Sequence, residues 1–335
     1  MPAYAVLGAT SWGVTLAALL ERAGNQVLLL TRSEVEAHAL RTAGGLERLG
    51  AGRVLGPRVT IHPVPIPPDH TRDLKGALIA VPSHTFRDSV IASGLGPSLP
   101  VVSATKGLEL ATSRRMSEIL ADLGFHPTRT GALSGPNLAQ EIIRGLPAAA
   151  VLALPDPDLA RQWQAALSAG TFRVYASTDV VGVELAGALK NVIAIAAGAA
   201  WGLGFGANAV AAIMTRGLAE ITRLGLALGG EIATFNGLAG VGDLAATCFS
   251  HLSRNRRFGE LLAAGRTPAQ AVAEIGETVE GAHTAPIALR LAASTGVELP
   301  ITAEVAAVIG GERTVPESML RLLGRPLARE DLPGR

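Results

Sequence analysis

The chain has 335 residues, and its 29 Lys and Arg residues nearly balance 28 Asp and Glu residues, leaving a formal net charge of +1. This balance gives no global field for nucleic acid or an anionic membrane, so any recognition of phosphate must be local. The length predicts two domains, and the low charged fraction of 17% indicates that much of the chain is buried. The single cysteine, Cys248, excludes an intrachain disulfide, and the first residues lack the features of a signal peptide. We therefore expect a cytoplasmic protein.

The first half alternates short apolar runs with helical stretches. Ala3–Gly8 and Gln26–Leu30 are typical of strands, and Ser11–Arg22 between them has the apolar stripe of a helix. Further strands are predicted at Gly76–Val81, Val101–Ala104, Ala148–Ala153 and Phe172–Tyr175. Short apolar strands that alternate with helices favour a parallel sheet covered by helices, an α/β domain.

From about Asp179 the runs become long, rich in Ala and Leu, and helix-periodic, which predicts an all-helical second half. The domains are accordingly predicted as residues 1–178 and 179–335. The uncharged run Val192–Met214 is as long as a membrane span. Several glycines interrupt it, and no basic loop flanks it, so we favour a buried helix, a glycine loop and a second helix without membrane insertion.

A glycine-rich loop, Gly8-Ala9-Thr10-Ser11-Trp12-Gly13, follows the first predicted strand. It fits the dinucleotide fingerprint at its first and third glycines, and it precedes a helix N-terminus whose N–H groups attract pyrophosphate. Thr10 stands where the second glycine is usual, and its side chain would push the pyrophosphate outward or hydrogen-bond it. A tight turn in another α/β protein is the alternative.

Thr31-Arg32-Ser33 ends the second predicted strand, where an NAD enzyme usually presents an acid to the ribose. Because Arg32 could instead pair with a 2′-phosphate, with a hydroxyl on either side, we expect a preference for NADP(H) over NAD(H). A solvated loop arginine is the competing interpretation.

Two lysines are candidates for proton transfer. Reduction of a ketone by hydride needs a group that stabilises and protonates the alkoxide, and a lysine of lowered pKa does both. Lys106 follows a predicted strand, and Lys190 lies in otherwise apolar helical sequence. A lysine in such a helix could equally extend to the surface.

Ser253-Arg254-Asn255-Arg256-Arg257 is the densest basic group, and its donors suit a phosphate monoester. The alternative is a charged helix face, on which only some side chains point the same way. Asp243, in an apolar glycine-rich loop, could hold a substrate hydroxyl, orient a lysine or cap a helix.

Six motifs in order closely resemble bacterial NAD(P)-dependent glycerol-3-phosphate dehydrogenase, from Val6 to about Gly324. They are VPSHTFRD from Val81, ATKGLE from Ala104, SGPNLAQE from Ser134, LAGALKNVIAIAAG from Leu185, GFGANA from Gly204 and SRNRRFG from Ser253. The resemblance implies reversible reduction of dihydroxyacetone phosphate to sn-glycerol 3-phosphate, the head-group precursor of phospholipids. It also implies a Rossmann-type doubly wound domain followed by a helical domain, in a homodimer.

The resemblance also implies individual roles. Lys190 would be the catalytic proton donor or acceptor, with Lys106 and Asp243 beside it. Contacts to the substrate are implied for Lys106, Gly135, Asn137, Lys190, Asp243, Ser253, Arg254 and Asn255. Contacts to the cofactor are implied for Ser11, Trp12, Arg32, Lys106, Ala139, Arg254 and Glu280, which join Gly8 and Gly13 of the loop. No metal is required.

Three departures from the family pattern are Thr10, Gln140 where a lysine is common, and the segment 41–62. Two other functions remain open. One is a dehydrogenase of similar build with a carboxylate substrate, of the ketopantoate or hydroxyisobutyrate type, for which the basic group at Ser253 is richer than needed. The other is a non-catalytic NADP(H)-binding sensor, which would have no need for Lys106, Lys190 and Asp243.

Overall fold

A computed structural model describes residues 3–66, 70–71 and 73–326. The chain divides into two compact units, Met1–Thr105 with Arg114–Val180 and Lys106–Ser113 with Val181–Arg335. We call them the sheet unit and the helical unit. A boundary at residue 178 leaves the segment Lys106–Ser113 with the sheet, whereas the structure groups this segment with the helices.

The sheet unit contains an eight-stranded sheet in the order β3-β2-β1-β4-β5-β6-β7-β8. The strands are β1 (Ala3–Leu7), β2 (Gln26–Thr31), β3 (Val59–Pro63), β4 (Leu74–Ile79), β5 (Val101–Ser103), β6 (Thr130–Ser134), β7 (Ala148–Ala153) and β8 (Phe172–Ser177). Neighbouring strands are parallel except at β6–β7. The chain order reverses between β1 and β4, the point at which open α/β sheets bind ligands.

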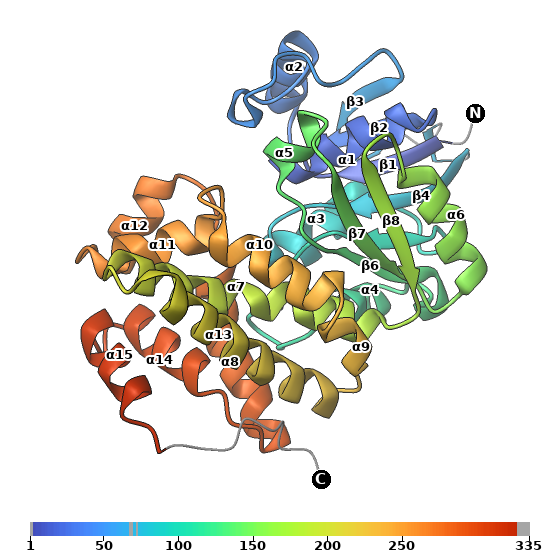
Figure 1. Ribbon diagram of the computed structural model, residues 1–335. Helices are drawn as coiled ribbons and strands as arrows, with labels where there is room; N and C mark the ends of the chain where they lie inside the picture. The colour runs from blue at the N-terminus through green and yellow to red at the C-terminus, as the bar shows by residue number, and fades with distance from the viewer. Residues whose placement is uncertain (1–2, 67–69, 72, 327–335) are drawn as a thin grey trace. The chain divides into compact units, whose positions relative to one another are not determined.

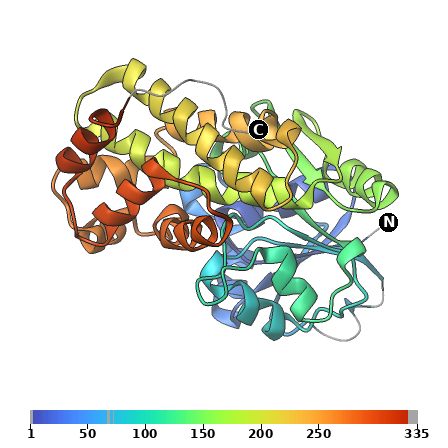
Figure 2. The same ribbon diagram turned by 90° about the horizontal axis from the view of Figure 1, so that it is seen from below.

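Helices cover both faces of this sheet (Figure 1). Along β1, Tyr4 and Val6 pack into one core, and Ala5 and Leu7 pack into the other, because successive side chains of a strand point to opposite faces. Figure 2 shows α3 and α4, in cyan and teal, against the second face. The helical elements of the unit are α1 (Ser11–Arg22), α2 (Glu34–Ala43), η1 (Glu47–Leu49), η3 (Ser83–Thr85), α3 (Phe86–Ser93), α4 (Met116–Asp122), η4 (Pro127–Arg129), α5 (Ala139–Ile143) and α6 (Pro157–Leu167). The doubly wound α/β prediction is confirmed.

Two strands, β3 and β6, were absent from the sequence prediction. Thr130–Ser134 is made mainly of small residues and lacks the β-branched run that marks a strand. Its five residues are nevertheless fully buried between β5 and β7. Close packing with neighbours therefore determines this strand, and the antiparallel pairing at β7 was likewise not expected.

Beyond Ser177, every element in the described part of the chain is helical. These elements are α7 (Val180–Gly202), α8 (Gly206–Ala227), α9 (Ile232–Phe235), the π-helical turn η5 (Leu238–Gly242), α10 (Asp243–Phe249), α11 (Arg254–Ala263), α12 (Pro268–Ile275), α13 (Glu280–Thr295), α14 (Pro300–Ile309) and α15 (Val315–Leu323). The apolar helix α7 runs through the middle of this unit (Figure 1).

Two helical stretches have the length and hydropathy of a membrane span, Val180–Gly202 and Ile232–Phe249. The first has 94% of its most apolar window buried inside the protein, and the second joins three short elements. The run Val192–Met214 is interrupted as expected, since α7 ends at Gly202 and α8 begins at Gly206. A core helix accounts for the apolar length of α7.

The backbones of α7 and α11 touch at two glycines. A Cβ on Gly198 would lie 1.9 Å from the carbonyl oxygen of Arg256, and a Cβ on Gly259 would lie 2.0 Å from that of Ile195. Any side chain at either position would force the helices apart. These two glycines therefore allow the N-terminal half of α11 to pack directly against α7.

Candidate active site

The glycine loop joins β1 to α1 at the strand-order reversal. Gly8 has a φ of +112°, and a Cβ on Gly13 would lie 1.9 Å from the carbonyl oxygen of Gly8. The Thr10 hydroxyl donates to the Ala80 carbonyl at 2.7 Å and accepts from the Gly13 amide at 3.0 Å. Thr10 is therefore the N-cap of α1, and its one hydroxyl proton is donated to the Ala80 carbonyl rather than held for a ligand. Displacement of a pyrophosphate by its side chain stays a prediction.

The N-terminus of α1 suits an anionic ligand. Its first turn contains no acidic residue, and Ser11 and Trp12, the first two residues of the helix, are partly exposed. The indole nitrogen of Trp12 is buried and has no hydrogen-bond partner among the described residues. Helix N–H groups and dipole favour phosphate at such a place. These residues fit a dinucleotide, which when bound supplies a hydride.

Arg32 follows β2, and its side chain is 87% exposed with its Nε 3.6 Å from a Glu36 carboxylate oxygen. Of the flanking hydroxyls, Thr31 donates to backbone carbonyls, whereas Ser33 accepts from the Glu36 amide as the cap of α2. The Thr31 hydroxyl proton is therefore used within the protein, and the contribution of Arg32 and Ser33 to a 2′-phosphate site stays a prediction. Glu36 of α2 also accepts a hydrogen bond from the Arg32 amide, so an acidic residue does lie at this turn. The sequence Thr31-Arg32-Ser33 alone does not indicate it.

The helical unit brings three predicted catalytic residues together. Lys190, in the middle of α7, donates from Nζ to Asp243 Oδ1 at 2.8 Å. Lys106 Nζ donates to Asp243 Oδ2 at 2.6 Å. Asp243 is the first residue of α10, which follows the N-cap Gly242. One carboxylate therefore bridges two ammoniums, an arrangement that favours the interpretation of Asp243 as a residue that orients a lysine.

This cluster carries one negative and two positive charges with little water. The side chains of Lys106, Lys190 and Asp243 are 17%, 8% and 2% exposed. Burial lowers the pKa of Lys106 to about 8, and the Lys190 ammonium adds to this while Asp243 opposes it. Burial raises the pKa of Asp243, but the two ammoniums outweigh it and hold that pKa below its ordinary value. Lys106 can thus lose its proton at a pH well below that of an ordinary lysine.

Thr247 and Asn191 complete the surroundings of Lys190 and were not among the predicted site residues. Thr247 accepts from Lys190 Nζ at 2.5 Å and donates to the Asp243 carbonyl at 2.6 Å. Asn191 accepts at Oδ1 from Asn255 at 2.9 Å. Thr247 lies one helical turn after Asp243 on α10. The spacing of these two polar residues at i and i+4 could have indicated in the sequence that Thr247 belongs to the same site.

Most side chains of the basic group at the start of α11 bond within the protein, whereas Arg254, described below, is exposed. Ser253 caps the helix through the Arg256 amide, and Asn255 is buried between Asn191 and the Gly281 amide. Arg256 is also buried, bonds Glu260 and the Phe249 carbonyl, and stacks on Trp201 at 5.0 Å. Arg256 therefore stabilises the helix packing, in agreement with the expectation that only some side chains of this group point the same way.

Arg254 keeps a side chain that is 43% exposed at the N-terminus of α11, 3.4 Å from Glu277. Asn255, the next residue, donates to Asn191, which follows Lys190 in α7, so the N-terminal end of α11 packs against the helix that contains Lys190.

The remaining predicted residues lie at helix or loop starts. In the sheet unit, Gly135 is buried with a φ of +142°, and Ala139 begins α5. Asn137 has both amide atoms buried without a hydrogen-bond partner among the described residues. Unpaired buried amide groups are costly, so they mark a place where a polar ligand would be held. In the helical unit, Glu280 begins α13.

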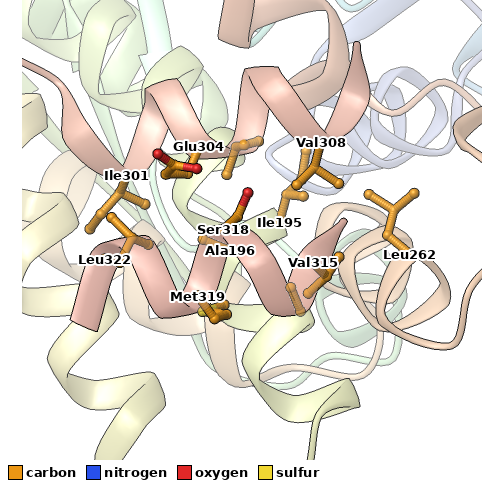
Figure 3. Close-up of a pocket in the computed structure, with 12 residues that line it drawn as sticks. Ile195, Ala196, Leu262, Ile301, Glu304, Val308, Val315, Ser318, Met319 and Leu322 are labelled. Atoms are coloured by element: carbon orange, nitrogen blue, oxygen red, sulfur yellow. The ribbon is translucent and has the colours of Figure 1, made fainter. Parts of the chain in front are cut away.

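Two hollows lie away from these residues. Figure 3 shows the smaller one, among α7, α11, α14 and α15, with an apolar lining interrupted by Glu304 and Ser318. Its volume of about 30 Å³ suits one water molecule rather than a substrate. The larger, about 890 Å³, is lined by residues such as Tyr4, Pro100 and Trp163. Tyr4 lies in the first half of β1 and Pro100 just before β5, at the amino ends of the strands, whereas α/β sheets bind ligands at the carboxyl ends.

Comparison with known proteins extends over almost the whole chain. Residues 3–160 match the N-terminal model, and residues 179–320 the C-terminal model, of NAD-dependent glycerol-3-phosphate dehydrogenase. The chain belongs to this family. Glycerol-3-phosphate dehydrogenase (NAD(P)+) of Moorella thermoacetica is 44% identical over 97% of each chain. The second such enzyme of Sphingopyxis alaskensis is 44% identical over 98% of each.

The fold agrees with that of the glycerol-3-phosphate dehydrogenase family. The crystal structure of glycerol-3-phosphate dehydrogenase from Coxiella burnetii superimposes with a TM-score of 0.89 and 33% identity, covering 96% of this chain and 99% of that one. The resemblance inferred from the six motifs is therefore confirmed, and a carboxylate-specific relative is not favoured.

Proposed function

We propose that the chain catalyses the reversible reduction of dihydroxyacetone phosphate to sn-glycerol 3-phosphate with NAD(P)H. Membership of the NAD-dependent glycerol-3-phosphate dehydrogenase family supports an oxidoreductase of this class. The observation that carries the proposal is the bridged cluster Lys106–Asp243–Lys190, because a buried ammonium held by a carboxylate suits protonation of an alkoxide.

In this mechanism Lys190 donates the proton during reduction and accepts it during oxidation. Asp243 and Thr247 fix the direction of Nζ, since both accept hydrogen bonds from it. Lys106 adds a second positive charge that stabilises negative charge developing on the carbonyl oxygen. A bound nicotinamide supplies the hydride, and no residue of this cluster needs to form a covalent bond.

The substrate phosphate is proposed to bind at the N-terminus of α11. Arg254 provides an exposed guanidinium there, and the helix dipole adds positive potential. Ser253 and Asn255 contribute mainly by holding this helix end, because their side chains already bond within the protein. The unpaired amide of Asn137, with Gly135 nearby in sequence, supports their implied role in substrate binding.

For the cofactor, Gly8, Ser11, Trp12, Gly13 and Ala139 are proposed to line the dinucleotide site, with contributions from Lys106, Arg254 and Glu280. Preference for NADP(H) rests on Arg32, whose high exposure leaves its guanidinium accessible. NAD(H) is the other cofactor of the class. We further propose a cytoplasmic homodimer that supplies glycerol 3-phosphate for phospholipid synthesis.

The two other functions make different demands on the site. A non-catalytic sensor does not require the bridged lysines, which are costly to bury. A carboxylate substrate would also pair with Arg254, so the chemistry at α11 alone does not exclude it. The family match decides against that alternative.

The test is to mix the purified protein with dihydroxyacetone phosphate and follow the absorbance of NADPH and NADH in separate assays. We expect turnover with both and a higher kcat/KM for NADPH. Ketopantoate serves as the matched carboxylate control. Turnover of ketopantoate alone, or binding of NADPH without turnover of either ketone, would contradict the proposal.

A further inference from the structure

Arg48 lies beside the glycine loop although it is distant in sequence. It belongs to η1, within the segment 41–62 that departs from the family pattern. Its Nε donates to Ser11 Oγ at 2.7 Å across 37 residues. Ser11 is the first residue of α1, so the Arg48 guanidinium is held at the end of the helix that suits phosphate.

The backbone around Arg48 is fixed by two contacts and one turn conformation in the sheet unit. Gln140 Nε2 of α5 donates to the Arg48 carbonyl at 2.8 Å. The next residue, Leu49, is fully buried in the core. Gly50 then ends the turn with a φ of +64°. Two departures from the family pattern, Gln140 and the segment 41–62, therefore act together to place this arginine.

The chemistry of this group favours a pyrophosphate. A guanidinium has five N–H donors in one plane, and the bond from Nε to Ser11 orients that plane at the N-terminus of α1. Neither the cap at Thr10 nor the first turn of α1 provides a formal positive charge. Arg32 follows β2 instead, where a dinucleotide places its adenosine ribose.

We propose that Arg48 binds the pyrophosphate of the dinucleotide, whereas Arg32 acts only on the 2′-phosphate. This inference rests on the dinucleotide binding included in the proposed function. It makes Arg48 a residue that sets the affinity for both cofactors, and it assigns the choice between them to Arg32 alone.

The experiment measures dissociation constants for NADPH, NADH and ADP-ribose by quenching of tryptophan fluorescence or by calorimetry. In Arg48→Gln we expect all three to weaken by about tenfold, as loss of one charge-assisted contact predicts, with an unchanged NADPH-to-NADH ratio. Affinity should also depend less steeply on salt. In Arg32→Ala only NADPH should weaken.

Arg53→Gln is the matched control, because Arg53 lies in the same segment and donates to the Thr42 carbonyl instead. Thermal unfolding of each variant without ligand establishes that the fold is kept, and Arg48→Lys should recover part of the affinity. Ser11→Ala retains the arginine charge and should weaken binding less than Arg48→Gln does.

Loss of NADPH affinity alone in Arg48→Gln would place this arginine at the 2′-phosphate and overturn the proposal. Unchanged constants for all three ligands would also overturn it and leave Arg48 a structural link to Ser11. ADP-ribose carries no reactive ring, so these results stand whether or not dihydroxyacetone phosphate is the substrate. Absence of turnover with dihydroxyacetone phosphate would contradict the proposed function, but it would leave the proposed role of Arg48 in dinucleotide binding unaffected.

Discussion

The polar sites of the two units consist of different kinds of chemical group. In the sheet unit, the candidate cofactor site consists of helix N–H groups, a threonine cap and arginines at the surface, such as Arg32 with its side chain 87% exposed. In the helical unit, the lysine cluster consists of charged side chains that are nearly inaccessible, with Asp243 2% exposed. Binding a large anion needs many weak contacts near water, whereas moving one proton needs few groups with fixed positions and altered pKa values.

This difference predicts how each site responds to substitution. Removing one contact from the surface site should lower affinity by a modest factor, because the remaining contacts and water compensate. Removing one member of the buried cluster leaves an unpaired charge or no proton donor, and the loss should be far larger. Substitutions in the two units test that contrast, from the largest expected effect to the smallest.

Lys190→Ala should lower kcat by roughly 10²–10⁴-fold, the usual contribution of a general acid, because it removes the proposed proton donor. The dissociation constant of NADPH, measured by fluorescence, should change little. Steady-state kinetics with dihydroxyacetone phosphate provide the test. An unchanged kcat would show that Lys190 is not the proton donor, and it would also contradict the expected difference between the buried cluster and the surface site.

Arg254→Ala should raise the KM for dihydroxyacetone phosphate by about 10–100-fold through loss of a charge-assisted bond to phosphate. Some affinity for NADPH should be lost as well, since the family resemblance gives Arg254 a cofactor contact. Arg257→Ala is the control, because Arg257 is an exposed residue on the same helix. Equal effects of the two substitutions would show only a general charge effect.

The pH dependence of reduction should report on Lys106. Its pKa is lowered to about 8, so the ammonium loses its proton as pH rises through that value. We expect kcat/KM for reduction to fall about tenfold per pH unit above that point, since the free enzyme must carry the charge. In Lys106→Arg the same decline should move to higher pH. A profile that declines at the same pH in both proteins would assign it to another group.

Thr10→Ala should reduce the free energy of unfolding by about 1 kcal/mol, because it removes the N-cap of α1. Thr10→Ser retains the hydroxyl and should be close to the wild type in urea unfolding. The dissociation constant for NADPH should change by less than about tenfold in both variants, as expected where the threonine makes no direct bond to phosphate. A larger loss of affinity than of stability would restore a direct role for Thr10.

Local sequence pattern is enough to predict several elements and the main catalytic candidates. Runs such as Gln26–Leu30 are apolar enough to identify β2, and the long apolar α7 is recognisable as a buried helix. Lys106, Lys190 and Asp243 stand out because charged residues in apolar sequence are unusual. The family match then supplies the class of reaction.

The features that escaped prediction depend on contacts between distant residues. The five small residues of β6 form a strand only because neighbours pack closely on both sides. Arg256 and Arg254 are equivalent in the sequence, but one is buried against Trp201 and the other is exposed. The bond between Arg48 and Ser11 spans an irregular segment, and no periodicity indicates it.

The glycine contact between α7 and α11 has a consequence for the spacing of the proposed substrate contacts. Lys190 is carried by α7 and Arg254 by α11, and Gly198 and Gly259 hold these helices at the smallest separation that backbones allow. The spacing between the proposed proton donor and the proposed phosphate-binding end of α11 therefore depends on two glycines outside both groups. A methyl group added at Gly198 would press on the Arg256 carbonyl and displace α11 from α7, which would change the spacing between Lys190 and Arg254.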